Sequence, residues 1–388
     1  MRSSRRMEGI APFHVMELMA KAQALEAQGR DIVHMEVGEP DFPTPEPIIA
    51  AAQHFLAGGH VHYTPALGLP RLREAISVHY AARHGVTVAP ERIIVTAGAS
   101  GALLLALGAL ITPGDEWLLT DPGYPCNRHF VRFLEGVPRM LAVEADTDYQ
   151  PTPEKVSASW TAKTRGLLVA SPANPTGTVI EPTQLTSIWQ AVAAHGGTLI
   201  VDEIYHGLTY GFDAHTALEI SDQIIVINSF SKYFGMTGWR LGWLVVPPGI
   251  ARDIEKLAQN VYIAPSTPAQ HAALAAFAPE TTAILEARRA AFRLRRDLLL
   301  PGLEKLGFRI ATEPLGAFYI YAELGNLSSD SFTLADQLLE HAGVAATPGL
   351  DFGTHAPAKH MRFAYTVAED KLVEGLARMG RCLAAQRQ

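Results

Sequence analysis

The residue in this sequence with the clearest chemical potential is a lysine that follows a buried strand pattern. Lys232 lies in the stretch SFSKYFGMTGWRLGW, residues 229–243, directly after the apolar run IIVI of residues 224–227. No aspartate or glutamate occurs within eight residues of it on either side. An amine held out of water without a carboxylate partner shifts toward its neutral, nucleophilic form. Lys232 is therefore suited to forming a Schiff base with an aldehyde, although an ordinary loop lysine remains the alternative for this residue alone.

Two groups of residues nearby are suited to binding an anion. The first group, close to the lysine, consists of Ser229, Ser231 and Arg240. The second group, in the stretch TAGASGA between an expected strand and an expected helix, consists of Gly98, Ala99 and Ser100. Backbone amides at a helix N-terminus favour an anion, and a guanidinium pairs well with phosphate oxygens. Together the two groups predict a site for one doubly charged phosphate, although the glycine-rich turn by itself is common in α/β proteins.

Two further strand ends carry polar residues. Asn174, in SPANPTG, comes just after the expected strand that ends at Ala170, and Asp202 follows the apolar run TLIV, with Tyr205 three residues on. A carboxylate after four apolar residues is costly unless it meets a cation, and a protonated pyridine nitrogen would be such a cation. Asp202 alone is equally consistent with a structural N-cap for a following turn.

The elements that must position these residues are short β-rich runs. Six runs are recognised, at residues 92–96, 116–120, 166–170, 198–201, 224–227 and 241–246. Most are separated by amphipathic helical stretches such as residues 182–195. Apolar strands that alternate with helices predict an α/β protein with a buried, largely parallel sheet. Ligand groups gather beyond the strand ends of such sheets, which is where the residues above cluster.

The C-terminal part has a different pattern. Residues 267–306 are expected to be helical. Their arginines, which we expect to form a solvated helix side, are Arg288, Arg289, Arg293, Arg295 and Arg296. Short strands at residues 317–321 and 360–365, with two helices, predict a smaller α+β domain, and the segment up to about Pro45 is expected to pack with it.

Composition excludes several classes of protein. Apolar residues make up 48% and charged residues 18%, so a large core can form and disorder is not expected. A net charge of −7 argues against nucleic acid as a partner. The longest apolar run, residues 102–111, is about half the length of a membrane span. Cys126 and Cys382 offer neither a disulfide framework nor metal-ligand spacing, so we expect a cytoplasmic protein without a metal or membrane contact.

The motifs as an ordered set resemble one family. The residues that carry the resemblance are Asn174 in NPTG, Asp202, Tyr205, Lys232 at the end of SFSK, and Arg240 eight residues later. They are similar to the class I/II pyridoxal-phosphate aminotransferases of fold type I, the aspartate-aminotransferase-like family, and the match runs from about Val37 to Tyr365. The resemblance implies a three-layer α/β sandwich around a seven-stranded, mostly parallel mixed sheet, with a smaller α+β domain.

The resemblance also implies how the chain is divided and assembled. A large cofactor-binding domain would span residues 46–290, and both termini, residues 1–45 and 291–388, would form the small domain. The family implies a homodimer with shared active sites, in which Tyr63, in HYTPALG, reaches the phosphate of the partner subunit. Its substrates would be an amino acid and a 2-oxo acid.

The resemblance assigns a role to each motif. Lys232 would form the Schiff base with pyridoxal 5'-phosphate and carry the proton, and Asp202 would keep the pyridine nitrogen protonated. Asn174 and Tyr205 would hydrogen-bond the phenolic oxygen, and Tyr124, in DPGYP, would stack on the ring. Singly, each residue also has a purely structural interpretation, such as a half-buried aromatic ring or a surface ion pair.

The remaining assignments concern the two anionic groups. The phosphate cup is matched by Gly98, Ala99, Ser100, Ser229 and Arg240, with Ser231 beside the lysine. The substrate α-carboxylate would be held by Gly38, in VGEPDF, by Arg362, in MRFAY, and by Asn174. The fork of a guanidinium suits a carboxylate, so lysine would not replace Arg362 conservatively.

The substrate side chain is suggested by departures from the family. Aspartate-specific members of the subgroup that this chain most resembles have a lysine where it has Ser100, and hydroxyl residues where it has Phe13 and Val15. We therefore expect alanine or a larger apolar or aromatic donor, with 2-oxoglutarate as the acceptor that the family implies. Met16 and Met19 would line an apolar pocket or belong to a helix core. A candidate for pairing with a distal carboxylate, by its proximity to Tyr124, is Arg128.

Three alternatives accompany this hypothesis. A carbon–sulfur β-lyase shares nearly every cofactor residue, because the same carbanion can eliminate a leaving group. Aspartate aminotransferase is the second alternative. The cofactor-binding domain of a transcription regulator is the third, and it would need a DNA-binding module for which the stretch ahead of Gly38 is too short.

Overall fold

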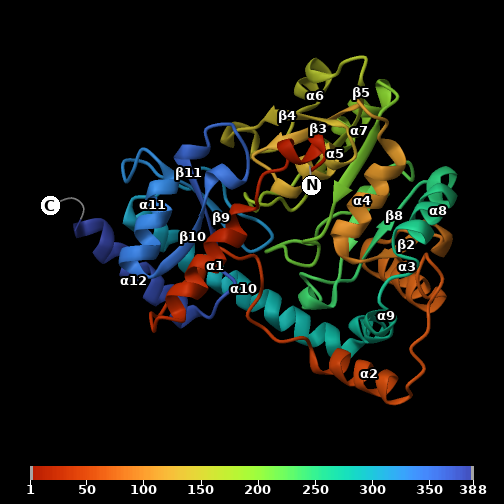
Figure 1. The fold of residues 1–388 in the computed structure, drawn as a ribbon, viewed down its shortest axis with the longest axis horizontal. Coiled ribbons are helices and arrows are strands. Elements are labelled where there is room, and N and C mark those ends of the chain that lie inside the picture. Colours follow the sequence, from red (N-terminus) through yellow and green to blue (C-terminus); the bar gives the residue numbers. More distant parts are fainter. Residues whose placement is uncertain (1–2, 386–388) are drawn as a thin grey trace.

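A seven-stranded sheet forms the centre of the larger part of the molecule (Figure 1). The computed structural model describes residues 3–385, so residues 1–2 and 386–388 of the predicted small domain lie outside the described residues. In spatial order the strands are β2 (Ile93–Thr96), β8 (Gly242–Val245), β7 (Ile225–Ser229), β6 (Thr198–Asp202), β5 (Thr164–Ala170), β3 (Glu116–Asp121) and β4 (Val137–Ala142). Only β8 is antiparallel to its neighbours. The predicted mixed, mostly parallel sheet is confirmed.

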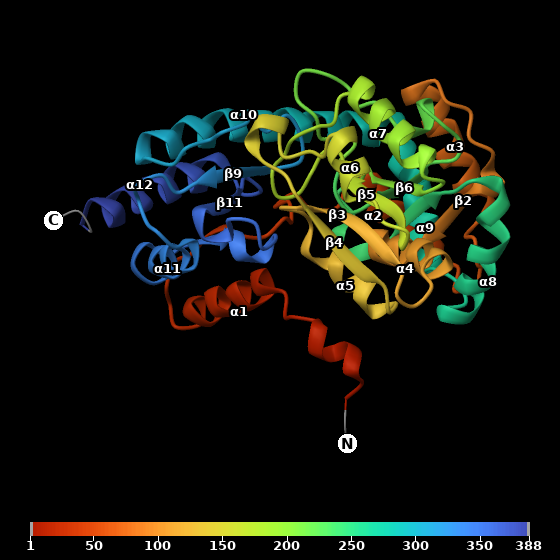
Figure 2. The same cartoon turned by 90° about the horizontal axis from the view of Figure 1, so that it is seen from above.

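Both faces of this sheet are buried because successive side chains of each strand point to opposite sides. In β6, Leu199 and Val201 pack into one core and Ile200 into the other. The first core is covered by α3 (Pro70–His84), α6 (Pro153–Ser159), α7 (Pro182–Ala194) and α9 (Thr267–Ala273). The second is covered by α4 (Gly98–Leu110), α5 (Pro125–Phe133) and α8 (Ala251–Val261). The predicted three-layer sandwich is therefore confirmed (Figure 2).

One strand of the sheet was not among the six predicted runs. β4 contains Pro138 and Arg139, and its side chains are mostly exposed or half-buried. It lies at the sheet edge and pairs only with β3. An edge strand tolerates proline and charge, so its sequence lacks the continuous apolar run by which the central strands are recognised.

A four-stranded sheet organises the smaller part of the molecule. Its order is β1 (Val33–Met35), β10 (Val344–Pro348), β11 (His360–Ala364) and β9 (Tyr319–Glu323). The helices packed around it are α1 (His14–Glu26), α11 (Ser331–Gln337) and α12 (Glu369–Ala385). The parallel pairing of β1 with β10 shows that residues 33–35 of the N-terminal segment pack with this region, whereas Arg6 and Gly9 contact α5 of the larger part. The predicted start of β9 at Ala317 is wrong, because Ala317 has a left-handed φ of 58° and the strand begins at Tyr319.

A long helix connects the two parts of the molecule. α10 (Pro279–Leu306) contacts α2 (Glu46–Ala57) as well as α12 and β9. The predicted helical stretch 267–306 is thus divided into α9, a 3-10 turn at Leu274–Phe277, and α10. The proposed boundary between residues 290 and 291 falls inside α10, and the division into domains stays a prediction.

The expectation that the arginines of α10 form a solvated side is wrong for two of them. Arg295 and Arg296 are only 5% and 9% exposed. Arg295 makes two hydrogen bonds to the carboxylate of Asp41, at 2.8 and 3.0 Å, and one to Thr366 O at 2.9 Å. Arg296 donates to Pro314 O at 3.1 Å. The charge pattern of a helix does not reveal such partners, which come from distant parts of the chain.

We predict that Arg295→Ala lowers the free energy of unfolding by about 2–3 kcal/mol, because it removes three hydrogen bonds and one partner of a partly buried ion pair. Arg293→Ala on the same helix is the matched control, because Arg293 is exposed, and it should change stability by less than about 0.5 kcal/mol. Urea unfolding of the cofactor-free protein measures both. Equal losses in the two variants would contradict the buried arrangement.

Candidate functional site

A cavity of about 250 Å³ lies at the carboxyl ends of β5, β6 and β7, with walls from both parts of the molecule. The sequence-predicted residues that line it are Gly38, Ala99, Ser100, Tyr124, Asn174, Asp202, Tyr205, Ser231, Lys232, Arg240 and Arg362. The structure thus brings together residues that are separated by more than 300 positions in the chain. The convergence follows in part from the sheet, whose parallel strands β5, β6 and β7 present their carboxyl ends at one edge.

Three predicted residues do not line this cavity. Ser229 is 1% exposed, and its Oγ lies 2.9 Å from Ser231 Oγ and 3.1 Å from Leu241 O. Gly98 lies behind the guanidinium of Arg240. Tyr63 is 82% exposed and projects from the surface. Their assignment to the cofactor therefore stays a prediction.

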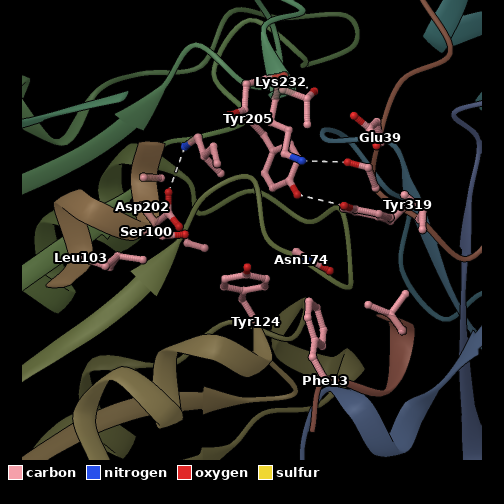
Figure 3. Close-up of a pocket in the computed structure, with 18 of the residues that line it drawn as sticks. Phe13, Glu39, Ser100, Leu103, Tyr124, Asn174, Asp202, Tyr205, Lys232 and Tyr319 are labelled. Atoms are coloured by element: carbon pink, nitrogen blue, oxygen red, sulfur yellow. Dashed lines mark hydrogen bonds between the residues drawn. The ribbon is translucent and has the colours of Figure 1, made fainter. Parts of the chain in front are cut away.

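The amine and the carboxylate at the centre of the site come from neighbouring strands (Figure 3). Asp202 ends β6, and its Oδ1 accepts a hydrogen bond from Ile204 N at 3.1 Å. Burial raises the pKa of Asp202 to about 7, although that hydrogen bond and the charge of Lys232 oppose the shift. Lys232 follows β7 and donates to Gly38 O at 2.7 Å.

The amine of Lys232 has an unusually low pKa. Removal from water lowers the pKa of Lys232 to about 8, and the charges of Arg362 and Arg240 act in the same direction. The carboxylate of Glu39, which also lines the cavity, opposes this shift. A substantial fraction of the amine is therefore neutral, and able to act as a nucleophile or base, near pH 8.

A buried guanidinium is held rigidly on the side of the small sheet. Arg362, 3% exposed in β11, donates to Asn174 Oδ1 at 2.8 Å and to Glu36 O. Its guanidinium also lies 4.2 Å from the ring centroid of Tyr319. Its Nε has no hydrogen-bond partner among the described residues. A fixed guanidinium that lines the cavity suits the capture of a carboxylate.

Two residues that sequence reasoning missed complete this side of the cavity. The hydroxyl groups of Tyr319 and Tyr205 form a hydrogen bond, with 3.0 Å between their oxygens. The ring of Tyr319 also packs against the guanidinium of Arg362. A Cβ on Gly38 would lie 1.8 Å from the Tyr319 hydroxyl, so only glycine allows this approach. The other missed residue is Glu39. The stretch AFYIYAE around Tyr319 gave no signal beyond an aromatic strand, whereas Glu39 adjoins the predicted Gly38.

The opposite end of the cavity is built for an anion. α4 begins at Gly98, and no side chain caps its first turn, in which Ala99 and Ser100 line the cavity. Gly98 has a φ of 71°, and a Cβ there would lie 2.6 Å from Arg240 Nη2. Free amides at a helix N-terminus and an adjacent guanidinium together favour a phosphate.

One wall of the cavity is apolar and consists of Phe13, Val15 and Met16. Leu103 also lines the cavity, but it lies on α4 beside Ser100 (Figure 3). Phe13 contacts Tyr124 edge to face, with 6.2 Å between ring centroids. Met19 is not among the lining residues, so only Met16 meets the expectation for the two methionines. Arg128 does not line the cavity either and donates to Asp351 O at 3.0 Å, so its predicted part in binding a distal carboxylate has no support.

Comparison with known proteins agrees with this geometry. Residues 30–379 match the family model of aminotransferase class I and II. The chain belongs to the class I and II aminotransferases. It is 40% identical over 380 residues to the valine–pyruvate aminotransferase of Mycobacterium tuberculosis, which covers 97% of this chain and 98% of that protein. It is 36% identical over 383 residues to the aspartate/prephenate aminotransferase of Thermus thermophilus, over 98% of each chain.

Solved structures extend the likeness to three dimensions. An aminotransferase from Mycobacterium tuberculosis superposes with a TM-score of 0.96 at 40% identity, over 100% of both chains. The aspartate aminotransferase of Thermus thermophilus with maleate superposes with a TM-score of 0.93 at 36% identity, over 98% of this chain and 100% of that one. The predicted family, enzyme class and pyridoxal-phosphate cofactor of this aminotransferase are therefore confirmed.

The residues of the cavity fit pyridoxal phosphate. The buried carboxyl of Asp202 lies where a cationic ring nitrogen would stabilise its charge, and the Lys232 amine can react with an aldehyde. Arg240 and the first turn of α4 suit the phosphate. Among the described residues, no group of three His, Cys, Asp or Glu side chains could hold a metal ion, and no helix is long and apolar enough to cross a bilayer.

The low pKa of the Lys232 amine can be measured directly. We predict that acetylation of Lys232 in the cofactor-free protein rises to half its maximum near pH 8, because burial lowers its pKa. Lys21 is the internal control, because hydrogen bonds to Asp336 and Glu340 raise its pKa above the usual 10.5. Competitive labelling followed by peptide mass spectrometry gives both curves. A midpoint for Lys232 at or above that of Lys21 would contradict the electrostatics of the site.

Proposed function

We propose that this aminotransferase takes its amino group from L-alanine or a larger apolar or aromatic L-amino acid. The observation that carries the proposal is the set of cations in the cavity. Among the described residues that line it, the only ones are Lys232, Arg240 and Arg362. Lys232, Arg240 and Arg362 are proposed to bind the aldehyde, the phosphate and the α-carboxylate. The described part of this chain therefore has no further cation in the cavity for a second substrate carboxylate. The apolar wall of Phe13, Val15 and Met16 instead suits an apolar side chain.

The chain's own residues would perform the chemistry as follows. When bound, pyridoxal phosphate supplies a conjugated ring that withdraws electrons from the bonds at the substrate Cα. Arg362 binds the α-carboxylate and so orients the Cα–H bond. Lys232 Nζ, neutral in part near pH 8, would remove the Cα proton as a base and then, as an acid, deliver it to the former aldehyde carbon of the cofactor.

The other polar groups of the site would support this proton transfer. Asp202 would pair with the cofactor's cationic nitrogen, and this pairing would favour the ionised form of the Asp202 carboxyl. Tyr205 would donate a hydrogen bond to a cofactor oxygen, with its own orientation fixed by Tyr319. Asn174 would contact both the cofactor and the substrate α-carboxylate. Its Oδ1 already accepts a hydrogen bond from Arg362, the residue proposed to bind that carboxylate.

The apolar character of this wall also affects which 2-oxo acid can act as the amino-group acceptor. 2-Oxoglutarate, which the family resemblance implies, carries a distal carboxylate that the wall would leave without a partner in this chain. Pyruvate has no such group, and the relative from Mycobacterium tuberculosis is named for valine and pyruvate. We propose that pyruvate suits the cavity of a single chain better, whereas efficient use of 2-oxoglutarate would require a cation from a second copy.

A half-reaction screen tests the proposed donor. We predict that L-alanine, L-valine or L-phenylalanine converts the bound cofactor to its aminated form with a kcat/KM at least about tenfold above that of L-aspartate, because an unpaired buried carboxylate is costly. Stopped-flow absorbance of the holoenzyme measures each rate, and adding pyruvate or 2-oxoglutarate measures the return. A clear preference for L-aspartate would establish the aspartate alternative.

Two controls complete the screen. Lys232→Ala should show no conversion with any donor, because it lacks the proposed base. Cystathionine tests for the β-lyase, and rapid release of pyruvate and thiol without an added 2-oxo acid would overturn the transaminase assignment of the main activity.

We also propose that the enzyme is a homodimer, as the family resemblance implies. Tyr63 is 82% exposed, and the nearby Val61 and Leu56 are about half exposed, at 46% and 50%. His62 O accepts from Thr267 Oγ1 at 2.7 Å, which holds this segment beside α9. Exposed apolar residues gathered around one segment are typical of a surface that is covered in the assembled protein.

Light scattering after size-exclusion chromatography tests the assembly. We predict a mass of two chains of 42.0 kDa each. Tyr63→Ala should weaken retention of the cofactor during dialysis, because Tyr63 is proposed to bind the phosphate of the partner subunit. Phe133→Ala is a control of an exposed aromatic residue, 44% exposed on α5. A monomeric mass would contradict the proposal.

A further inference from the structure

The apolar wall of the cavity is fixed by a carboxylate from a distant part of the chain. Asp351, 1% exposed, accepts hydrogen bonds from His14 N on Oδ1 and from Val15 N on Oδ2, each at 3.2 Å. These are the first two amides of α1, and the N-cap residue Phe13 provides no side-chain cap. A carboxylate at this position satisfies two free donors and interacts favourably with the helix dipole.

The same residue connects the wall to the large domain. Arg128 of α5 donates to Asp351 O at 3.0 Å, and Tyr124 is the N-cap residue of that helix. Phe13 contacts the Tyr124 ring edge to face. Asp351 therefore lies at the meeting point of α1, α5 and its own turn. The cavity is lined by Val15 and Met16 of α1 and by Tyr124, the residue just ahead of α5.

The rest of α1 is held independently of Asp351. Lys21 pairs with Asp336 at 2.5 Å and with Glu340 at 2.8 Å, and Ala22 packs into a small core with Leu339. Ahead of the helix, Arg132 Nη1 donates to Gly9 O at 2.6 Å. Loss of the Asp351 carboxylate should therefore loosen residues 10–16 while the helix stays attached.

We propose that Asp351 is a specificity-positioning residue, which holds Phe13 and Val15 as a fixed wall and thereby favours donors with large apolar side chains. This inference rests on the proposed function. A large side chain gains from the wall only when Phe13 and Val15 keep their positions, because a mobile wall must be ordered on binding. The methyl group of alanine buries little surface and gains correspondingly less.

The ratio of kcat/KM for two donors separates the effect of the apolar wall from the other effects of substituting Asp351. Asp351 also lies within electrostatic range of Arg362, so its substitution can alter binding of the α-carboxylate. Every donor carries the same α-carboxylate, and that contribution cancels when L-phenylalanine is compared with L-alanine. A general loss of folding or of cofactor would likewise affect both donors equally.

The test uses half-reactions of the holoenzyme with L-phenylalanine, L-alanine and L-aspartate. We predict that Asp351→Asn lowers the ratio of kcat/KM for L-phenylalanine over L-alanine about fivefold to tenfold, because it removes the charge and one of the two oxygens that accept the amides of His14 and Val15. The effect should lie in KM, and the absorbance spectrum of the cofactor should not change. Asp330→Asn is the matched control, because Asp330 caps α11 through Thr333 N at 2.8 Å and does not line the cavity.

A second readout does not depend on activity. Hydrogen exchange with mass spectrometry should show faster exchange in residues 10–17 of Asp351→Asn, with the C-terminal half of α1 unchanged. In a Phe13→Ala background, Asp351→Asn should alter the donor ratio much less, since it acts through that ring.

The outcomes separate the two proposals. A preference of the unmodified enzyme for L-aspartate would refute the proposed function. If the unmodified enzyme prefers apolar donors but Asp351→Asn keeps the donor ratio within about twofold, the positioning role is refuted and the function stands. Unchanged exchange in residues 10–17 would also refute it.

Discussion

The structure of the site depends on holding an amine and a carboxylate out of water at the ends of two adjacent strands. Lys232 and Asp202 follow apolar runs whose side chains fill the cores on both faces of the sheet. Burial moves their pKa values toward each other, to about 8 and about 7. Neither group is neutralised by a close ion pair, so both remain available to a ligand that brings an aldehyde and a cationic nitrogen.

Close packing around these two groups explains residues that carry no charge themselves. The carbonyl oxygen of Gly38 accepts a hydrogen bond from Lys232, and the absence of a side chain on Gly38 leaves space for the Tyr319 hydroxyl. That hydroxyl in turn forms a hydrogen bond with Tyr205. Because Tyr319 and Arg362 belong to the small sheet, the cavity exists only while the two parts of the molecule stay together. α10, whose Arg295 pairs with Asp41, contributes to that connection.

The sequence predicted the features that depend on local pattern. The buried strands can be recognised because each is an apolar run that ends at polar, proline or glycine residues, and Asp202 and Lys232 stand out because their types conflict with those runs. β4 was missed because an edge strand lacks that pattern. Arg295 and Tyr319 were misread or missed because their burial depends on partners far along the chain, and Asp351 acts on amides 336 and 337 residues away. Contacts between residues so far apart in the chain cannot be recognised from the spacing of neighbouring residue types.

Lys232, among the eight lysines of the chain, is the amine that we propose binds the cofactor. Borohydride reduction of the holoenzyme, followed by proteolysis and mass spectrometry, identifies the lysine to which the cofactor becomes covalently attached. We predict a single modified peptide that contains Lys232. Attachment to any other lysine, with Lys232 unmodified, would contradict it.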